Sequence, residues 1–487
     1  RFHQIDLFLK YPHEVQNELL MSLISTSKDT EIGKKFDFNS IRNYRDFTQR
    51  VPVSSYEDYQ NLIERSRKGE KNIFWPKPIN WFAKSSGTTS AKSKFIPVSA
   101  DSLEDCHYAA GKDLLCMYLN NNENSTLFNG KNLRLGGSKE LYEENGTTFG
   151  DLSAILIDNM PLWAEFSSTP GNKVSLMSDW EYKMQAIVNE TINENVTSLA
   201  GVPSWMLVLL NNVLESTGNK NILDVWPNLE VYFHGGVSFL PYVDQYKSII
   251  PSKSFKYYEI YNASEGFFAI QDRNQSDELL LMLDYGIFYE FIPMQTHGTP
   301  TEVLIPLSQV EKGINYAIVI TTNAGLWRYK IGDTILFTST KPYRIKVTGR
   351  TKHFINVFGE ELIIENTDKA LKIVAKKTKS EILDYTVAPI FMEGKTKGAH
   401  EWIIEFKTPP KDLGYFNELL DNSLKSINSD YESKRYKNIT LNKPVIHSAK
   451  QGLFYKWMKR NDKLGGQHKI PRLSNSRDFL EELLKIN

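Results

Sequence analysis

The sequence predicts an α/β (α+β) protein with a large N-terminal domain and a smaller C-terminal one. Apolar runs that end in glycine or small polar residues alternate with helical patterns between about residues 133 and 261, which is the order of elements in an α/β sheet. Strand patterns then dominate as far as Thr348, and helices and strands alternate again beyond Arg350. The expected division is a large α/β domain over 1–348 with a small β-barrel-like subdomain, a hinge at 349–358 and a small α+β domain over 359–487.

The spacing of apolar residues supports each element in turn. Residues 1–75 have mostly helical spacing, and the strand pattern Leu133–Leu135 runs into two glycines. Pro203 favours the start of a helix, because the N–H that proline lacks is not needed in the first turn. The further expected elements are a helix at 180–194, a strand at 195–201, a helix at 204–214 and strands at 229–233 and 255–261.

Composition excludes several classes of protein. The 487 residues contain 58 basic and 58 acidic side chains, so their net charge gives no support to nucleic-acid or membrane-surface binding. Cys106 and Cys116 are the only cysteines, too few for a four-ligand zinc site, and we expect two reduced thiols in a cytoplasmic protein. No apolar run reaches the length of a membrane helix, no signal peptide is expected, and no obligate protein partner is evident.

The hydroxyl-rich stretch Ser85–Ser90 is the first candidate site. It lies between the apolar runs Ile79–Ala83 and Lys94–Val98, which predict a strand, a turn and a second strand. Backbone N–H groups and hydroxyls gathered in such a turn suit phosphate oxygens. The stretch lacks the Walker A spacing. A polar hairpin loop without a ligand remains the alternative.

Three further strand ends carry polar or glycine residues: His234-Gly235-Gly236, Tyr261–Gly266 and Trp327–Asp333. Ligands of α/β proteins bind beyond such ends. Glu265 could ligate Mg²⁺, and Asp333 could accept hydrogen bonds from a ribose diol. Each has a structural alternative: a turn residue for the histidine, a helix-dipole carboxylate for Glu265 and a turn cap for Asp333.

Taken in order, these motifs resemble the adenylate-forming superfamily of acyl-CoA synthetases and luciferases. The details are more similar to the Gretchen Hagen 3 family of acyl acid–amido synthetases, and to its bacterial branch. The resemblance runs from about Asn17 to Leu473. The matching strings are Ser85–Thr89, Tyr261–Glu265, Arg328–Asp333 and Gln467–Arg472.

The resemblance implies an ATP-dependent ligase with two half-reactions. A small carboxylic acid and ATP would give an acyl adenylate, and an amino acid amine would then take the acyl group and release AMP. The implied nucleotide-binding residues are Ser85, Ser86, Gly87, Thr88 and Thr89 at the phosphates, Gly235, Gly236 and Tyr261 at the adenine with the adjoining Asn262, Ala263 and Ser264, and Asp333 with Arg350 at the ribose. Glu265 would hold Mg²⁺, and Lys469 would reach the α-phosphate from a mobile C-terminal domain.

The acyl pocket and the acceptor stay open. Val202, Trp205 and Trp163 are candidates for an apolar pocket wall, although such side chains are often simply core. Glu361 stands near where related proteins often have a lysine, and Ala91 stands where a glycine is usual. Thioester formation with coenzyme A, or an acyl- or nucleotide-binding protein without turnover, are the alternatives to amide synthesis.

Overall fold

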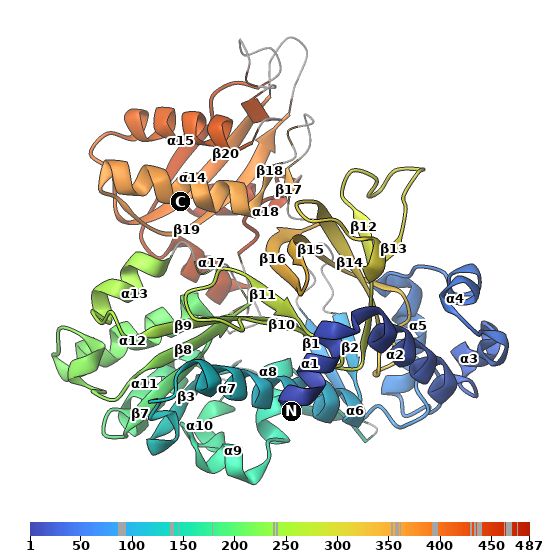
Figure 1. Ribbon diagram of the computed structural model, residues 1–487. Coiled ribbons are helices and arrows are strands. Elements are labelled where there is room, and N and C mark those ends of the chain that lie inside the picture. The colour runs from blue at the N-terminus through green and yellow to red at the C-terminus, as the bar shows by residue number, and fades with distance from the viewer. Residues whose placement is uncertain are drawn as a thin grey trace.

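The fold is seen in a computed structural model (Figure 1). It describes the chain except residues 86–93, 137–140, 145, 178, 237–238, 240–241, 352–353, 356–359, 361, 392–397, 429–430, 433–434, 436–440, 462, 464–469 and 475. Beyond this part of the chain lie five residues of the predicted site: Ser86, Gly87, Thr88, Thr89 and Lys469.

The N-terminal region is helical, as predicted, and is anchored to the sheet by one buried amide. Gln16 donates from Nε2 to the carbonyl oxygens of Leu283 and Ile287 at 2.8 and 2.9 Å, and its Oε1 accepts from the Tyr289 amide at 2.9 Å. These bonds satisfy backbone groups that the packed helix would otherwise leave unpaired. The helices are α1 (Phe2–Lys10), α2 (Pro12–Ser27), α3 (Glu31–Lys35), α4 (Tyr44–Arg50) and α5 (Tyr56–Arg67).

Parallel strands form one half of a 12-stranded sheet. Each neighbouring pair in this half runs parallel, and helices connect them, which confirms the predicted α/β class. The carboxyl ends of parallel strands meet at one edge, where α/β proteins bind ligands. From the outer edge inward, the strands are β6 (Ser168–Thr169), β3 (Lys131–Leu135), β7 (Val196–Gly201), β8 (Val231–Gly235) and β9 (Lys256–Ala263).

Antiparallel strands form the other half of the same sheet. We expected a small β-barrel-like subdomain within the large domain here, and these strands are joined to the parallel half: β9 and β10 pair as a hairpin and β11 pairs with β16, so hydrogen bonding continues without a break. In Figure 1 the yellow strands of this half curl away to the right. They are, in spatial order, β10 (Gly266–Ile270), β11 (Leu279–Leu281), β16 (Tyr343–Arg350), β15 (Tyr329–Thr340), β14 (Asn315–Thr322), β12 (Ile287–Pro293) and β13 (Ile305–Pro306).

A second sheet carries the hydroxyl-rich stretch. Its strands β1 (Trp81–Ser85) and β2 (Lys94–Val98) pair antiparallel, with Ser85 opposite Lys94. The two predicted strands are therefore confirmed, and the predicted turn between them, at residues 86–93, lies outside the described residues. The sheet is completed by β5 (Thr147–Gly150) and β4 (Tyr142–Glu144).

Helices cover both faces of the parallel strands. The buried side chains of β3 and β8 show which helices lie on which face. Leu133 packs in the core with α11 and α12, whereas Val231 and Phe233 of β8 belong to the core with α7 and α8. The first of these cores includes α11 (Trp180–Thr191), α12 (Pro203–Thr217) and α13 (Val243–Ile249), and the second includes α7 (Ala109–Asn121) and α8 (Leu152–Asp158). Three short helices complete this region: α6 (Ala100–Ser102), α9 (Leu162–Phe166) and α10 (Asn172–Ser175).

The C-terminal part has a sheet and a core of its own, shown in orange at the top of Figure 1. Trp402, Phe416 and Leu420 are fully buried between its strands and helices. Its first helix begins at Ile364, directly after the paired strands β17 (Phe354–Ile355) and β18 (Leu362–Ile363). The elements are α14 (Ile364–Thr378), β19 (Glu381–Ile390), β20 (Ala399–Thr408), α15 (Leu413–Ile427), β21 (Val445–Ala449), α17 (Leu453–Arg460) and α18 (Asp478–Ile486).

This C-terminal part packs directly on the larger sheet domain. Phe454 and Trp457 of α17 share one core with Trp205 of α12. Arg472 donates from Nη2 to the Tyr242 hydroxyl at 3.0 Å and lies 3.1 Å from Asp384. The division at residues 349–358 stays a prediction. Among the described helices, none has the length and apolar character needed to span a bilayer.

Candidate functional site

A cavity of about 940 Å³ opens at the carboxyl ends of the parallel strands. It also reaches between the sheet and the helices α7, α8 and α9, and it extends to the C-terminal domain. Because strands β8, β9 and β16 end here and β15 begins nearby, polar side chains from distant parts of the chain meet in it. The residues of the predicted nucleotide site that line it are Gly235, Gly236, Tyr261, Asn262, Ala263, Ser264, Glu265, Asp333 and Arg350.

Asp333 lies at the centre of these polar contacts. It stands directly opposite Arg350 in the β15–β16 ladder. Tyr261 donates its hydroxyl to Asp333 Oδ2 at 2.8 Å, and Arg350 Nε lies 2.9 Å from Oδ1. Burial, and then the charge of Asp333, raise the pKa of Tyr261 well above its ordinary value, and the charge of Asp333 raises the pKa of Arg350. The carboxylate is thus held in one orientation with lone pairs left for a further donor.

Glu265 lies in the turn between β9 and β10, close to Asp333. Burial, and then the negative charge of Asp333, raise the pKa of Glu265 to about 7. The described residues contain no group of three or more histidine, cysteine, aspartate or glutamate side chains able to enclose a metal ion. Mg²⁺ in nucleotide sites commonly uses one or two carboxylates together with phosphate oxygens. Glu265 therefore fits a magnesium ion that arrives with a nucleotide.

His234 is a packed residue and not a base. Its ring stacks on Phe239 at 4.2 Å between centroids, and burial lowers its pKa to about 3, so it stays neutral. His234 lies within strand β8 (Val231–Gly235) and its Nδ1 atom has no partner among the described residues, so the turn-residue alternative is wrong as well. Gly236 has φ +83°, a left-handed conformation that favours glycine. At Gly235 a Cβ atom would lie only 2.5 Å from the Ile260 carbonyl oxygen.

We expect Gly235→Ala to weaken both folding and nucleotide binding. The added methyl would push β8 away from β9, at a cost of about 1–3 kcal/mol, and the displaced strand end would no longer fit the nucleotide. The measurements are the unfolding temperature and the KM for ATP. Gly171→Ala is the control, because the nearest atom there is 3.5 Å away, an ordinary contact. An unchanged KM for ATP in Gly235→Ala would contradict a role of this strand end.

Only part of the predicted acyl pocket lies at the cavity. Val202 and Trp205 line it, and Trp205 is also part of the core beside α12. Trp163 lies in α9, but its side chain is outside the described part of the structure. Arg134, which sequence reasoning missed, lines the cavity from β3. The signal in the sequence is the alternation in Asn132-Leu133-Arg134-Leu135, since a strand buried on both faces normally has apolar residues throughout.

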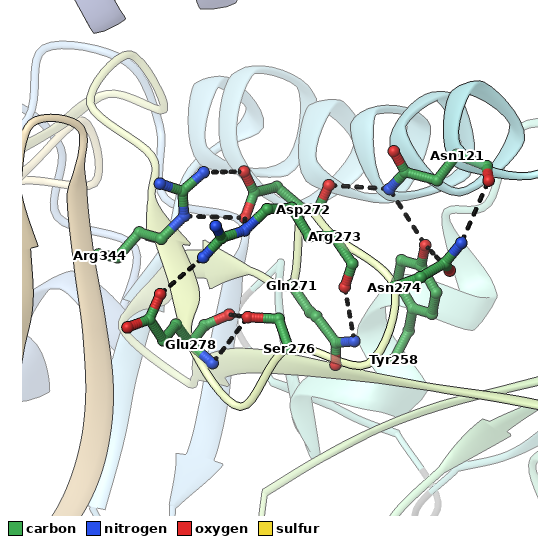
Figure 2. Close-up of polar contacts among 9 residues, drawn as sticks. All are labelled: Asn121, Tyr258, Gln271, Asp272, Arg273, Asn274, Ser276, Glu278 and Arg344. Atoms are coloured by element: carbon green, nitrogen blue, oxygen red, sulfur yellow. Dashed lines mark hydrogen bonds and ion pairs between the residues drawn. The ribbon is translucent and has the colours of Figure 1, made fainter.

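A polar cluster that the sequence did not reveal fixes strand β9, which carries Tyr261 (Figure 2). The β10–β11 loop is bonded to α7 through Asn121 Nδ2, which donates to the Asp272 carbonyl at 2.8 Å, and to β16 through Arg344, whose Nε donates to the Asp272 carboxylate at 3.2 Å. Tyr258 of β9 donates its hydroxyl to Asn274 at 2.7 Å. The loop thus joins three elements behind the site and orients the end of β9.

A mixed sheet of this topology, with a carboxylate, a guanidinium and a second carboxylate at its strand ends, is that of an adenylate-forming ligase. The GH3 family N-terminal domain matches residues 1–255, the central domain matches 280–350 and the C-terminal domain matches 365–478. The chain belongs to the GH3 family, and the resemblance noted in the sequence is confirmed. It is an enzyme of the ligase class, an acyl acid–amido synthetase.

Relatives and solved structures agree over nearly the whole length. The indole-3-acetic acid-amido synthetase GH3.4 of Arabidopsis thaliana is 22% identical over 96% of this chain and 90% of the relative. The 4-substituted benzoates-glutamate ligase GH3.12 of Arabidopsis thaliana is 23% identical over 96% and 94%. The GH3.15 acyl acid amido synthetase structure matches with TM-score 0.81 and 16% identity over 97% and 93%. A 2-hydroxyisobutyryl-CoA ligase in the postadenylation state has TM-score 0.61 and 12% identity over 97% and 91%.

Proposed function

We propose that this enzyme adenylates a small carboxylic acid with ATP and transfers the acyl group to the amine of an amino acid. The observation that carries the proposal is the contact of Asp333 with Tyr261 and Arg350, with Glu265 nearby, at the mouth of a cavity that continues beneath the sheet. The names of the relatives above, which conjugate acids to amino acids, support the amine as acceptor over coenzyme A.

In the first half-reaction the nucleotide would lie across the strand ends. Asp333 would accept hydrogen bonds from the ribose hydroxyls while Arg350 holds the aspartate, and Gly235 and Gly236 would leave room for the adenine. The hydroxyls from Ser85 onward would face the phosphates. Magnesium, held by Glu265, would offset phosphate charge when bound. The acid carboxylate would then attack the α-phosphorus, and pyrophosphate would leave.

In the second half-reaction the amine nitrogen would attack the acyl carbon, and AMP would leave. The cavity extends to the C-terminal domain, where Asp384, Glu405 and Lys407 line it. Carboxylates and an ammonium group are suited to bind the charged ends of an amino acid. We further propose that the C-terminal domain moves between the two steps and supplies Lys469 to the α-phosphate in the first.

The proposed partners are an acid, an amino acid and ATP, all of them small molecules. We propose the cytoplasm as the place of action, because ATP is available there and the thiols of Cys106 and Cys116, which are not paired with each other, would stay reduced.

The raised pKa of Glu265 leads to a pH prediction. Below about pH 7 the free enzyme carries Glu265 protonated, and above it the carboxylate can receive the metal. We therefore expect kcat/KM for Mg–ATP to fall by about tenfold for each unit below that value, while kcat stays flat because bound metal keeps the carboxylate ionised. A Glu265→Gln enzyme should lack this limb of the profile. The same acidic limb in Glu265→Gln would assign it to another group.

The direct test is pyrophosphate release with ATP and Mg²⁺ across a panel of carboxylic acids, repeated with mixed amino acids and with coenzyme A. Release that depends on an acid and rises with amino acids supports the proposal. Stimulation by coenzyme A alone would establish thioester synthesis instead. Nucleotide binding without release from any acid in the panel would contradict the proposed adenylation.

A further inference from the structure

An arginine with few partners lies inside the cavity on strand β3. Leu133 and Leu135 on this strand pack in the core beside α12, so Asn132 and Arg134 project from the opposite face, beneath α8 and α9. Arg134 is only 7% exposed and lines the cavity. An arginine so deeply buried is normally paired with a carboxylate.

The donors of Arg134 are mostly unused. Its Nη2 donates to Asn172 Oδ1 at 2.6 Å, and its Nη1 donates at 2.7 Å to the sulfur of Met160, which is a weak acceptor. Its Nε atom has no partner among the described residues, and no described carboxylate lies within ion-pair distance of the group. Glu165 holds the amide of Asn172 at 2.7 Å and so orients the arginine without pairing with it.

The surroundings of Arg134 suit a ligand more than a core. Asn132 donates to Ser198 at 2.8 Å, and buried His107, which also lines the cavity, has an Nδ1 atom with no partner among the described residues. Leu156 and Phe233 supply apolar wall between these polar groups. Burial lowers the pKa of Arg134, yet a guanidinium remains charged throughout the working range.

The strand register fixes the distance between Arg134 and the end of β8, where the nucleotide is proposed to bind. It pairs in register with Ala200 of β7, which pairs with Phe233 of β8, two residues before Gly235. Two strand spacings separate β3 from β8, so Arg134 lies roughly 10 Å to the side of the strand end at which the nucleotide is proposed to bind. A molecule that reaches both must have an aromatic ring or a medium-length chain between its ends.

We propose that the acyl substrate is a dicarboxylic acid, whose second carboxylate binds Arg134 while the first is adenylated. This substrate class rests on the function proposed above. A carboxylate can accept two parallel hydrogen bonds from a guanidinium, and it would supply a direct ion pair, whereas Glu165 acts on Arg134 only through space. Pairing at the far end also orients the acid, so the other carboxyl faces the α-phosphorus.

The test compares diacids with monoacids of matched length, hexanedioate with hexanoate and terephthalate with benzoate. Binding to the full-length enzyme is measured by calorimetry without ATP, and acid-dependent pyrophosphate release is measured separately. We expect the diacid of at least one pair to bind about 30-fold or more tightly than its monoacid. Arg134→Gln should abolish this preference while leaving turnover of the monoacid within a few fold, and Arg134→Lys should restore part of it.

Lys112→Gln is the matched control, since this exposed cation also lines the cavity, and it should keep the preference. Unfolding temperatures identify variants that fold poorly, and for these the comparison within the wild-type enzyme decides. Equal binding of both members of every pair by the wild type would overturn the proposal. A diacid preference that depends on Arg134, without pyrophosphate release, would support this binding site and count against adenylation instead.

Discussion

Replacing Glu265 with glutamine is expected to lower acid-dependent pyrophosphate release by about 100- to 1000-fold at saturating ATP. The substitution keeps the size of the side chain and removes its charge, so a magnesium ion loses its protein ligand. Glutamine is also neutral at every pH, whereas Glu265, with a pKa raised to about 7, is ionised above that value. Activity of the variant should therefore respond weakly to magnesium concentration at all pH values.

Glu259→Gln is the matched control for this prediction. Glu259 lies on β9, the strand that leads into the turn of Glu265; it lines the same cavity, and burial raises its pKa to about 7. It has no hydrogen bond or ion pair with Asp333 or Arg350, and it stands opposite His234 in the β8–β9 ladder. We expect near-normal adenylation and magnesium dependence in this variant. Equal loss in both variants would mean that burial of a carboxylate, and not a metal contact, explains the effect of Glu265.

Asp333→Asn is expected to reduce kcat/KM for ATP by about 100-fold or more. Asparagine cannot accept from Tyr261, Arg350 and a ribose diol at once, since its amide nitrogen is only a donor. It also leaves Arg350 without its counter-charge, which should cost about 2 kcal/mol of folding free energy. The measurements are steady-state kinetics in ATP and the unfolding temperature, so that lost binding is separated from lost stability.

Tyr261→Phe separates the two functions of this cluster. It removes the hydroxyl that donates to Asp333 at 2.8 Å but keeps the ring and the Asp333–Arg350 pair. We expect a loss of tenfold or less in kcat/KM for ATP. A Tyr261→Phe enzyme as poor as Asp333→Asn would show that orientation of the aspartate, and not its contact with ribose, carries the effect.

Local patterns were enough to predict most of the parallel half of the fold. Trp180–Thr191 and Pro203–Thr217 are helices, and Val196–Gly201 and Val231–Gly235 are strands, close to the predicted bounds. The extent of the sheet was not predictable in this way. Whether an antiparallel strand forms its own sheet depends on its neighbour, and the pairing of β11 with β16 joins residues far apart in the chain.

The residues of the candidate site likewise fall into those that local sequence patterns could predict and those that they could not. Asp333, Glu265 and the glycines after His234 could be proposed from the sequence because each stands at the end of an extended pattern, although Asp333 and Gly235 lie within β15 and β8 in the structure. Arg134 was missed because the sequence cannot show that its buried Nε atom has no partner among the described residues. Only the packed structure shows this. The polar cluster around Asp272 was likewise hidden, since its members come from α7, β9, β16 and one loop (Figure 2).

The measurement that tests the central claim most directly follows the carboxylate oxygens of the acid. The acid is labelled with ¹⁸O in both carboxylate positions and incubated with ATP, Mg²⁺ and amino acid, and the products are analysed by mass spectrometry. Attack on the α-phosphorus followed by amine transfer predicts AMP that carries one labelled oxygen, together with unlabelled pyrophosphate and an acyl amide. Label in inorganic phosphate with formation of ADP would contradict adenylation and show an acyl phosphate instead.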